Sequence, residues 1–306
     1  MTTDALRLRE EFLGRSRGEE LAELEMISPA FDGDEAKPQH RYLILSPPRS
    51  GSYWLCRQLW TAGLGLPCEY LNRLHLRRLS KRWGTPLEAF QTKTRVQRLA
   101  ARLGLERQRR ATTPSGAMGA DLQAYLVQAE RRRSRGGWFG LKVQPLHLKE
   151  LKLQPAVAFP DWMPLPLLRR NQRRQLASYL FSRTSGAYDT GLITTNEGEG
   201  LEHLDNPTLQ EETAALLAEQ NRLIVELCRQ RDLTPLWMED LMAQSSRELQ
   251  QTLIRVLPPL TGLEPCFQPI AQRGGSLHEA KQQLLGDLAS RLPDHLVSRL
   301  NDSLQP

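Results

Sequence analysis

The sequence LILSPPRSGSYWL, Leu43 to Leu55, gives the strongest indication of how the chain folds. Its apolar start, Leu43–Leu45, stops at two prolines, and an arginine then leads into the turn Ser50–Ser52. An apolar segment that includes Tyr53 follows and is read as a helix. The N-terminus of such a helix exposes unpaired backbone N–H groups and the positive end of the helix dipole. The pattern therefore predicts a strand, a turn built to hold an anion, and a helix.

The residues of this turn suit an anionic ligand. Arg49 supplies a fixed charge with forked donors. Gly51 allows the backbone to approach an oxyanion closely, and the hydroxyls of Ser50 and Ser52 add donors. The turn is no Walker loop, because GxxxxGK[ST] is absent and no Lys–Ser/Thr pair is available for Mg²⁺. We therefore predict an anion site without a metal.

Short apolar runs that alternate with helical patterns predict the fold class. Strands that alternate with helices favour a parallel sheet with helices on both faces. We expect an α/β protein with a P-loop-like three-layer fold and a small central parallel sheet. The expected strands are Tyr42–Ser46, Trp138–Val143, Leu165–Leu168 and Leu236–Met238. The expected helices are 52–62, 86–104, 119–133, 172–183 and 208–231.

The two ends of the proposed domain differ in pattern from its centre. Residues 4–30 are typical of an amphipathic helix, and 31–40 are typical of a linker. We therefore predict an N-terminal helical extension and linker over 1–40 and one catalytic domain over 41–306. The polar segment 184–206 is too long for a simple connection, which is typical of a functional lid or a disordered stretch.

Composition narrows the class of protein. The chain has 306 residues, of which 40% are hydrophobic, and it has no apolar stretch of the ~20 residues that a membrane helix needs. The start of the chain lacks the basic and apolar regions of a secretory signal. Its four cysteines form neither a CxxC pair nor a disulfide pattern. These observations predict a cytoplasmic protein without a transmembrane segment.

The formal net charge of +6 allows an anionic partner. The arginine clusters at 107–110 and 131–135 are interpreted as solvated faces, because no aromatic side chains alternate with them to stack on bases. We therefore expect no nucleic-acid partner.

A second candidate anion site lies in LLRRNQRRQLASYLFSR, Leu167 to Arg183. Arg169 stands at the end of an expected strand, and Ser178 follows about two and a half helical turns later. A charged donor and a hydroxyl in this arrangement could hold a second phosphate. A solvated basic helix is the alternative interpretation.

Four segments resemble, in order, blocks of the bacterial sulfotransferases of the trehalose 2-sulfotransferase type. These enzymes use PAPS, 3′-phosphoadenosine 5′-phosphosulfate. The segments are PPRSGSYWL, GLGLPCEYLN, GLKVQPLHLKEL and RRNQRRQLASYLFSRTSGAY, and the resemblance covers roughly residues 41–275. It implies a sulfotransferase that moves a sulfuryl group from PAPS to a hydroxyl of a carbohydrate or glycolipid-type acceptor, in line and without a metal. It leaves open whether the protein forms a homodimer.

The resemblance also implies roles for individual residues. Arg49, Ser50, Gly51, Ser52 and Tyr53 match the loop that wraps the 5′-phosphosulfate, and Arg49 would also stabilise charge in the transfer. Arg169 and Ser178 match the pair that holds the 3′-phosphate. Glu69 matches the glutamate of the acceptor block and is the candidate general base. Arg273, in AQRGG, matches an arginine in a loop over the nucleotide, and Lys142 matches a lysine of unassigned role.

The chain departs from the family pattern at three positions within the blocks that resemble it. Tyr53 stands where the family often has Thr, Asn171 where it commonly has Asp, and Arg170 where it usually has Pro. The segments 72–135 and 184–206, on the acceptor side, align poorly. The resemblance therefore implies the donor more strongly than the acceptor.

Two other functions stay open. A kinase-like nucleotide enzyme would need a Mg²⁺ carboxylate, for which the pair Glu239–Asp240 is the candidate. The other is a catalytically inactive protein of the same fold that binds PAP, which is PAPS without its sulfuryl group. Tyr53 and Asn171 favour this alternative. Within the sulfotransferase interpretation, His147 competes with Glu69 as the base.

Overall fold

The computed structural model describes residues 27–34, 37–85, 87, 116–185, 204–258 and 276–305. Most of the predicted N-terminal extension, nearly all of the helix expected at 86–104, most of the segment 184–206, and Arg273 lie outside these residues. For the described part, the bounds of every helix and strand follow below.

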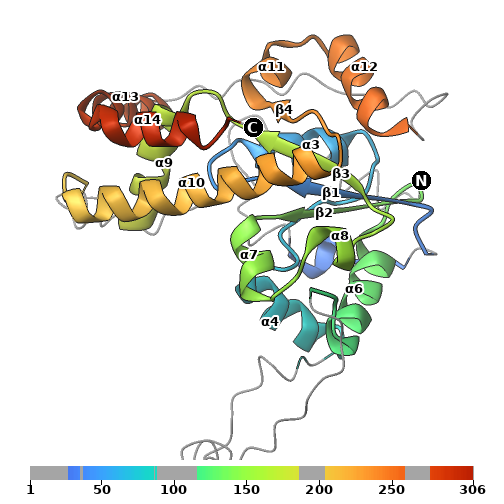
Figure 1. The fold of residues 1–306 in the computed structure, drawn as a ribbon. Helices are drawn as coiled ribbons and strands as arrows, with labels where there is room; N and C mark the ends of the chain where they lie inside the picture. The colour runs from blue at the N-terminus through green and yellow to red at the C-terminus, as the bar shows by residue number, and fades with distance from the viewer. Residues whose placement is uncertain are drawn as a thin grey trace, which may run out of the picture.

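A four-stranded parallel sheet forms the centre of the molecule (Figure 1). Its order is β2-β1-β3-β4, with β1 His40–Leu45, β2 Trp138–Val143, β3 Met163–Leu168 and β4 Leu236–Trp237. In β1, Ile44 lies opposite Lys142 of β2 and Leu165 of β3. All four strands lie within three residues of their predicted bounds, and the predicted α/β fold with a central parallel sheet is confirmed.

Helices cover both faces of this sheet, because alternate side chains of each strand point to opposite faces. Leu43 and Leu45 of β1 belong to one apolar core, and Tyr42 and Ile44 belong to another. The first core is closed by α4 Arg73–Arg82, α6 Ala120–Arg133, α7 Pro145–Glu150 and α8 Pro155–Ala158. The second is closed by α3 Ser52–Thr61, α11 Met238–Ala243 and α12 Ser246–Val256. Figure 1 shows these two groups below and above the sheet.

A third apolar cluster joins four helices beside the sheet. They are α9 Gln172–Ser185, α10 Pro207–Gln230, α13 Ser276–Arg291 and α14 Asp294–Asp302. The long helix α10 also packs its Ile224 and Cys228 against Leu168, the last residue of β3. This contact ties the cluster to the strand end from which Arg169 follows.

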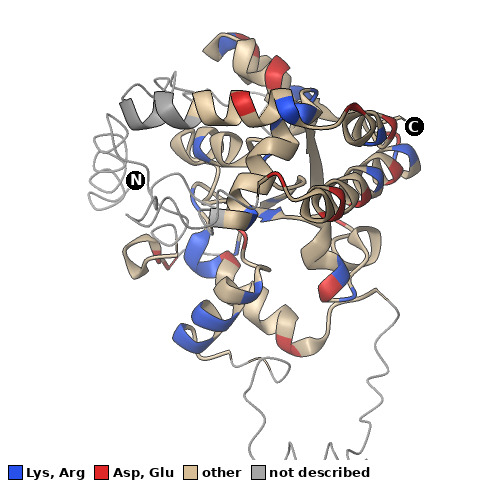
Figure 2. Cartoon of the chain, turned by 90° about the vertical axis from the view of Figure 1, so that its left-hand side faces the viewer, with Lys and Arg blue, Asp and Glu red and all other residues tan. Residues whose placement is uncertain are grey.

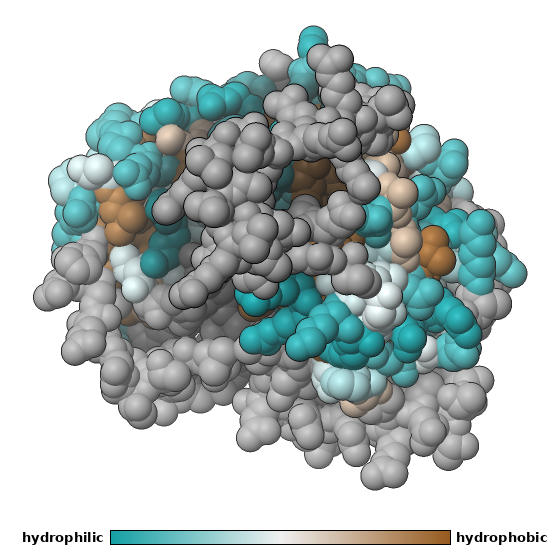
Figure 3. Space-filling view, turned by 90° about the horizontal axis from the view of Figure 1, so that it is seen from below, coloured by the Kyte–Doolittle hydropathy of each residue, from teal (hydrophilic) through white to brown (hydrophobic). Residues whose placement is uncertain are grey.

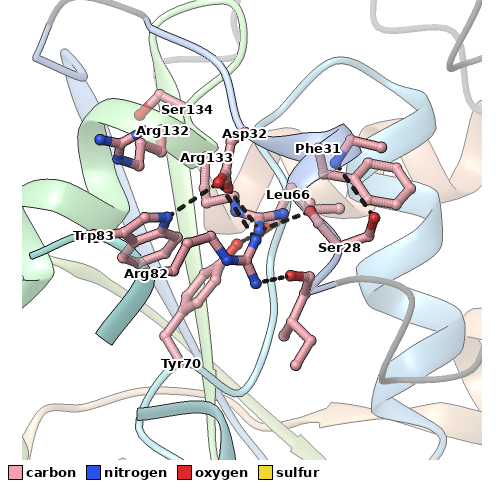
Figure 4. A network of polar contacts seen from close by, with 12 residues as sticks. Ser28, Phe31, Asp32, Leu66, Tyr70, Arg82, Trp83, Arg132, Arg133 and Ser134 are labelled. Atoms are coloured by element: carbon pink, nitrogen blue, oxygen red, sulfur yellow. Dashed lines mark hydrogen bonds and ion pairs between the residues drawn. The ribbon is translucent and has the colours of Figure 1, made fainter. Parts of the chain in front are cut away.

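A short N-terminal segment packs onto the lower helices, starting with the 3-10 helix η1 Pro29–Phe31. Its Asp32 accepts a hydrogen bond from the indole of Trp83 at 3.1 Å and pairs with Arg133 at 2.8 Å (Figure 4). Arg133 is completely buried and also donates to the carbonyl of Ser28. The prediction that the arginines at 131–135 are solvated is therefore wrong for Arg133, because the N-terminal segment covers it.

The surface of the described part is mostly polar. Lys and Arg gather low in the molecule, where α4 and α6 lie (Figure 2). Seen from below, hydrophilic side chains predominate, and exposed apolar atoms form separate patches (Figure 3). Within the described ranges, no helix has the length and apolar character of a membrane span.

Candidate functional site

The turn after β1 has a backbone that few residues adopt. Arg49 and Gly51 both have positive φ, at 60° and 81°. A Cβ on Gly51 would lie 2.7 Å from Cε of Met238, so the turn packs tightly against the first residue of α11, just after β4. A left-handed arginine costs about 1–2 kcal/mol, and such strain clusters at functional sites. The turn thus brings the N-terminus of α3 to the carboxyl edge of the sheet, where ligands of α/β proteins bind.

The two predicted anion sites lie in direct contact. The Nε of Arg49 donates to the hydroxyl of Ser178 at 2.8 Å, and Arg169 donates to the carbonyl of Arg49 at 3.1 Å. Two guanidinium groups and a hydroxyl therefore meet where β1 and β3 end. We call Arg49, Arg169 and Ser178 the anion cluster.

Helix α9 holds the turn in place through a residue to which no role was given from the sequence. The Gln175 amide donates to the carbonyl of Pro48 at 2.8 Å, and Gln175 is fully buried. Its place between Asn171 and Ser178 in the second anion motif was the available signal. In the turn itself, the buried hydroxyl of Ser50 has no hydrogen-bond partner among the described residues. A buried polar atom in that state favours a ligand, because leaving it unsatisfied costs free energy.

Asn171 keeps the function that an Asp would have at the start of α9. Its side-chain oxygen accepts the backbone N–H of Arg174 at 3.0 Å, and Asn caps helices as well as Asp does. The departure at Asn171 is therefore conservative for the fold. The departure at Arg170 lies on the surface, where Arg170 pairs with Asp240 at 2.7 Å and covers the ring of Trp237.

Glu239, the first acid of the pair that a kinase would use, is engaged by the start of α9. Its two carboxylate oxygens accept the backbone N–H groups of Arg170 and Asn171, each at 3.0 Å. Arg169 lies 3.6 Å away. Burial alone would raise the pKa of Glu239, but the two backbone N–H groups and Arg169 lower it. Glu239 is thus an internal anion that balances the charge of Arg169.

Glu69 lies in a second polar group, next to the edge strand β2. Cys68 pairs with Leu141 in parallel register, and the Lys142 N–H donates to the carbonyl of Cys68 at 3.0 Å. This pairing sets Glu69 beside Lys142, whose ammonium lies 2.6 Å from its carboxylate. Both side chains are almost fully buried, at 3% and 4% exposure. The resemblance left Lys142 without a role, and the structure shows it to be the ion-pair partner of Glu69.

Two amides complete the surroundings of the carboxylate. Gln144 donates to the same oxygen as Lys142 at 2.8 Å, and Asn72 donates to the other at 3.2 Å. Burial alone would raise the pKa of Glu69, but the charge of Lys142 and the hydrogen bonds from Lys142 and Gln144 hold it far below its ordinary value. Glu69 is therefore ionised at neutral pH.

Two histidines lie near this carboxylate. Burial lowers the pKa of His147, so that its ring is neutral near pH 7. Burial also lowers the pKa of His75 to about 4, and its Nδ1 lies 3.0 Å from the backbone carbonyl of Glu69. A neutral imidazole can accept a proton, so His147 keeps its place as the competing base.

Tyr53 joins the anion-binding turn to the Glu69 group. Its ring centre lies 4.0 Å from the ammonium of Lys142. The first turn of α3 therefore touches the ion pair on β2. In the described ranges, no group of three or more His, Cys, Asp or Glu side chains is arranged as a metal site would need.

Part of this chain is similar to a known protein family. A search of curated proteins found no match. Among solved structures, the sulfotransferase domain from the olefin synthase of Synechococcus PCC 7002 is similar at 17% identity, with a TM-score of 0.37, over 86% of this chain and 98% of that one. Residues 41–161, which carry the anion-binding turn, Glu69 and Lys142, match the family model of the Stf0 sulphotransferases.

Proposed function

We propose that this protein is a PAPS-dependent sulfotransferase of the trehalose 2-sulfotransferase type, acting on a hydroxyl of a carbohydrate or glycolipid. The anion cluster carries the proposal: Arg49, Arg169 and Ser178 are linked by hydrogen bonds beside a helix N-terminus. The match of residues 41–161 to the Stf0 sulphotransferases supports it. A donor with two phosphate-bearing positions fits a site where two strand ends each contribute an arginine.

The donor would be divided between the two strand ends. We propose that residues 49–53 hold the 5′-phosphosulfate, with the buried hydroxyl of Ser50 and the backbone N–H groups at the N-terminus of α3 as donors. Arg169 and Ser178 would hold the 3′-phosphate, and Arg273 would lie over the nucleotide. The buried Ser50 hydroxyl, which has no hydrogen-bond partner in the described part of the chain, and the backbone of Gly51, which carries no side chain of its own, both fit an oxyanion.

The transfer would proceed as an in-line displacement, in which positioning and charge stabilisation supply the catalysis. The acceptor oxygen bonds to sulfur as the bond between sulfur and the 5′-phosphate oxygen breaks, and PAP leaves. Arg49 would stabilise the charge that develops on that phosphate oxygen. The hydroxyl proton would pass to Glu69, with His147 as the alternative acceptor.

Glu69 can accept a proton because it is ionised, but its low pKa makes it a weak base. Its buried carboxylate is held between Lys142, Gln144 and Asn72. A base of low pKa takes a proton only once the attack has made the hydroxyl acidic. Proton transfer would therefore occur late, as the new oxygen–sulfur bond forms.

A comparison of two nucleotides tests the donor. PAP at millimolar concentration should raise the melting temperature, because a ligand that binds only the native state stabilises it. ATP with Mg²⁺ should have a smaller effect. A protein stabilised by ATP and Mg²⁺ but not by PAP would be a kinase-like enzyme, and the proposal would fail.

A further inference from the structure

Lys142 occupies a position in which a lysine is rarely found. It is 3% exposed, it stands one residue before the end of the edge strand β2, and both its neighbours in the strand are apolar and buried. Burying an ammonium group is costly unless the charge is paired and hydrogen-bonded. Burial of the Lys142 ammonium therefore suggests a role for its charge, because a buried leucine or methionine would fill the same space without that free-energy cost.

The contacts of Lys142 connect two parts of the proposed site. Its ammonium donates to Glu69 at 2.6 Å, and the centre of the Tyr53 ring lies 4.0 Å away. A cation over an aromatic face is attracted by the ring, more so where water is excluded. Lys142 thus touches both the candidate base and the first turn of α3, which follows the anion-binding turn.

Charged and titratable groups from three elements face Glu69. Lys142 comes from β2 and His147 from α7, while His75 of α4 contacts the backbone carbonyl of Glu69. Burial keeps both imidazoles largely neutral near pH 7. Among these groups, Lys142 supplies the full positive charge that keeps the buried carboxylate ionised.

We propose that Lys142 is a positioning residue for sulfuryl transfer, which holds the Glu69 carboxylate charged and aimed while the Tyr53 ring fixes the ammonium beside the anion-binding turn. This inference rests on the proposed function. It also gives a use to the departure at Tyr53, since a threonine has no ring to offer the ammonium. The negatively charged donor and the Glu69 carboxylate can then lie in one site, because the ammonium of Lys142 compensates the charge of the carboxylate.

The test compares Lys142→Met with Lys142→Arg. Met keeps the length of the side chain without its charge, and Arg keeps the charge. Without the ammonium, burial should protonate Glu69 near neutral pH, since full burial raises a carboxyl pKa by up to about 3–5 units. Lys142→Met should lose roughly 10²-fold or more in turnover at pH 7 and recover part of it as the pH rises. Lys142→Arg should keep a wild-type pH profile, and both variants should bind PAP almost normally.

Infrared spectroscopy gives a readout that does not depend on turnover. Lys142→Met should show the band of a protonated carboxyl at neutral pH, and the band should be absent from Lys142→Met/Glu69→Gln, which assigns it. At a pH high enough to ionise Glu69 in Lys142→Met, the double variant should also withstand more urea than Lys142→Met, because it leaves no unpaired charge buried. A merely structural role of Lys142 would move neither the band nor the acid limb of the pH profile.

The outcomes separate this inference from the proposed function. If the wild type transfers sulfuryl groups while Lys142→Met keeps an ionised Glu69 and the wild-type pH profile, the inference is overturned. If the wild type transfers none, the proposed function fails, and the infrared band still decides whether Lys142 holds Glu69 ionised. If Lys142→Met does not fold, Tyr53→Leu takes its place: a shifted acid limb or carboxyl band supports the inference, and an unchanged one overturns it.

Discussion

Replacing Gly51 by alanine should damage the anion-binding turn by an amount that the structure allows to be worked out. Gly51 has a φ of 81°, and a new Cβ would lie 2.7–2.8 Å from three side-chain atoms of Met238. The left-handed backbone costs an alanine about 1–2 kcal/mol. The contact adds little if Met238 adopts another rotamer, because methionine is flexible. We expect a loss of about 1–2 kcal/mol in the free energy of unfolding. We also expect that binding of PAP is no longer detectable in a calorimetric titration in which the wild type binds.

Gly63 provides a matched control. It has the same φ of 81°, but a Cβ there would meet no atom within 4 Å. Gly63→Ala should therefore lose a similar stability through the backbone alone and keep its affinity for PAP. Urea unfolding and calorimetric titration with PAP measure both effects for each variant. Equal PAP affinities in the two variants would show that Gly51 has no part in holding the donor.

Three further predictions concern the anion cluster, the base and the N-terminal segment. Ser178→Ala should weaken binding of PAP by about 1.5–3 kcal/mol in calorimetry. Binding of adenosine 5′-phosphosulfate, which lacks the 3′-phosphate, should weaken much less, and equal losses would remove Ser178 from the 3′ site. Glu69→Gln should cut turnover roughly 10²–10⁴-fold with PAP affinity kept, and a near-normal turnover would shift the base to His147. The pKa of Glu69 is lowered from 4.5 on folding, so the ionised carboxylate stabilises the folded state above that pH, and this stabilisation is lost as the pH falls below it. The free energy of unfolding of Glu69→Gln, measured in urea, should therefore depend less on pH in acid than that of the wild type. Asp32→Asn, which strips the buried Arg133 of its carboxylate, should cost about 3–5 kcal/mol by urea unfolding, whereas Asp34→Asn on the exposed surface should change little.

The sheet could be predicted because its strands are short apolar runs that end at polar turns. The run before Pro47 and Pro48 and the run before Arg169 both end within three residues of the expected place. Helix α4 was missed, because its exposed face is almost wholly basic and only His75, Leu76, Leu79 and Ser80 are buried. The apolar residues of this segment are Leu74, Leu76 and Leu79, and three leucines do not distinguish a helix from a solvated basic stretch.

The partners of the site residues could not be predicted from the sequence. Glu69 and Lys142 are 73 residues apart, and they meet because Cys68 pairs with Leu141, an isolated bridge without a strand pattern around it. Arg49 and Ser178 are 129 residues apart and meet because β1 and β3 are neighbours in the sheet. The sequence therefore predicted which residues could carry chemistry, and the order of the strands decided which of them touch.

Incubation with PAPS that carries radioactive sulfur, together with a panel of sugars, glycolipids and cell extract, measures sulfuryl transfer itself. Label should appear in an acceptor as a sulfate ester, with one PAP formed for each sulfate transferred, and Arg49→Ala should abolish both products. Tight binding of PAP without label in any acceptor, under conditions in which a known sulfotransferase labels its own, would rule out a sulfotransferase and favour a nucleotide-binding protein of the same fold.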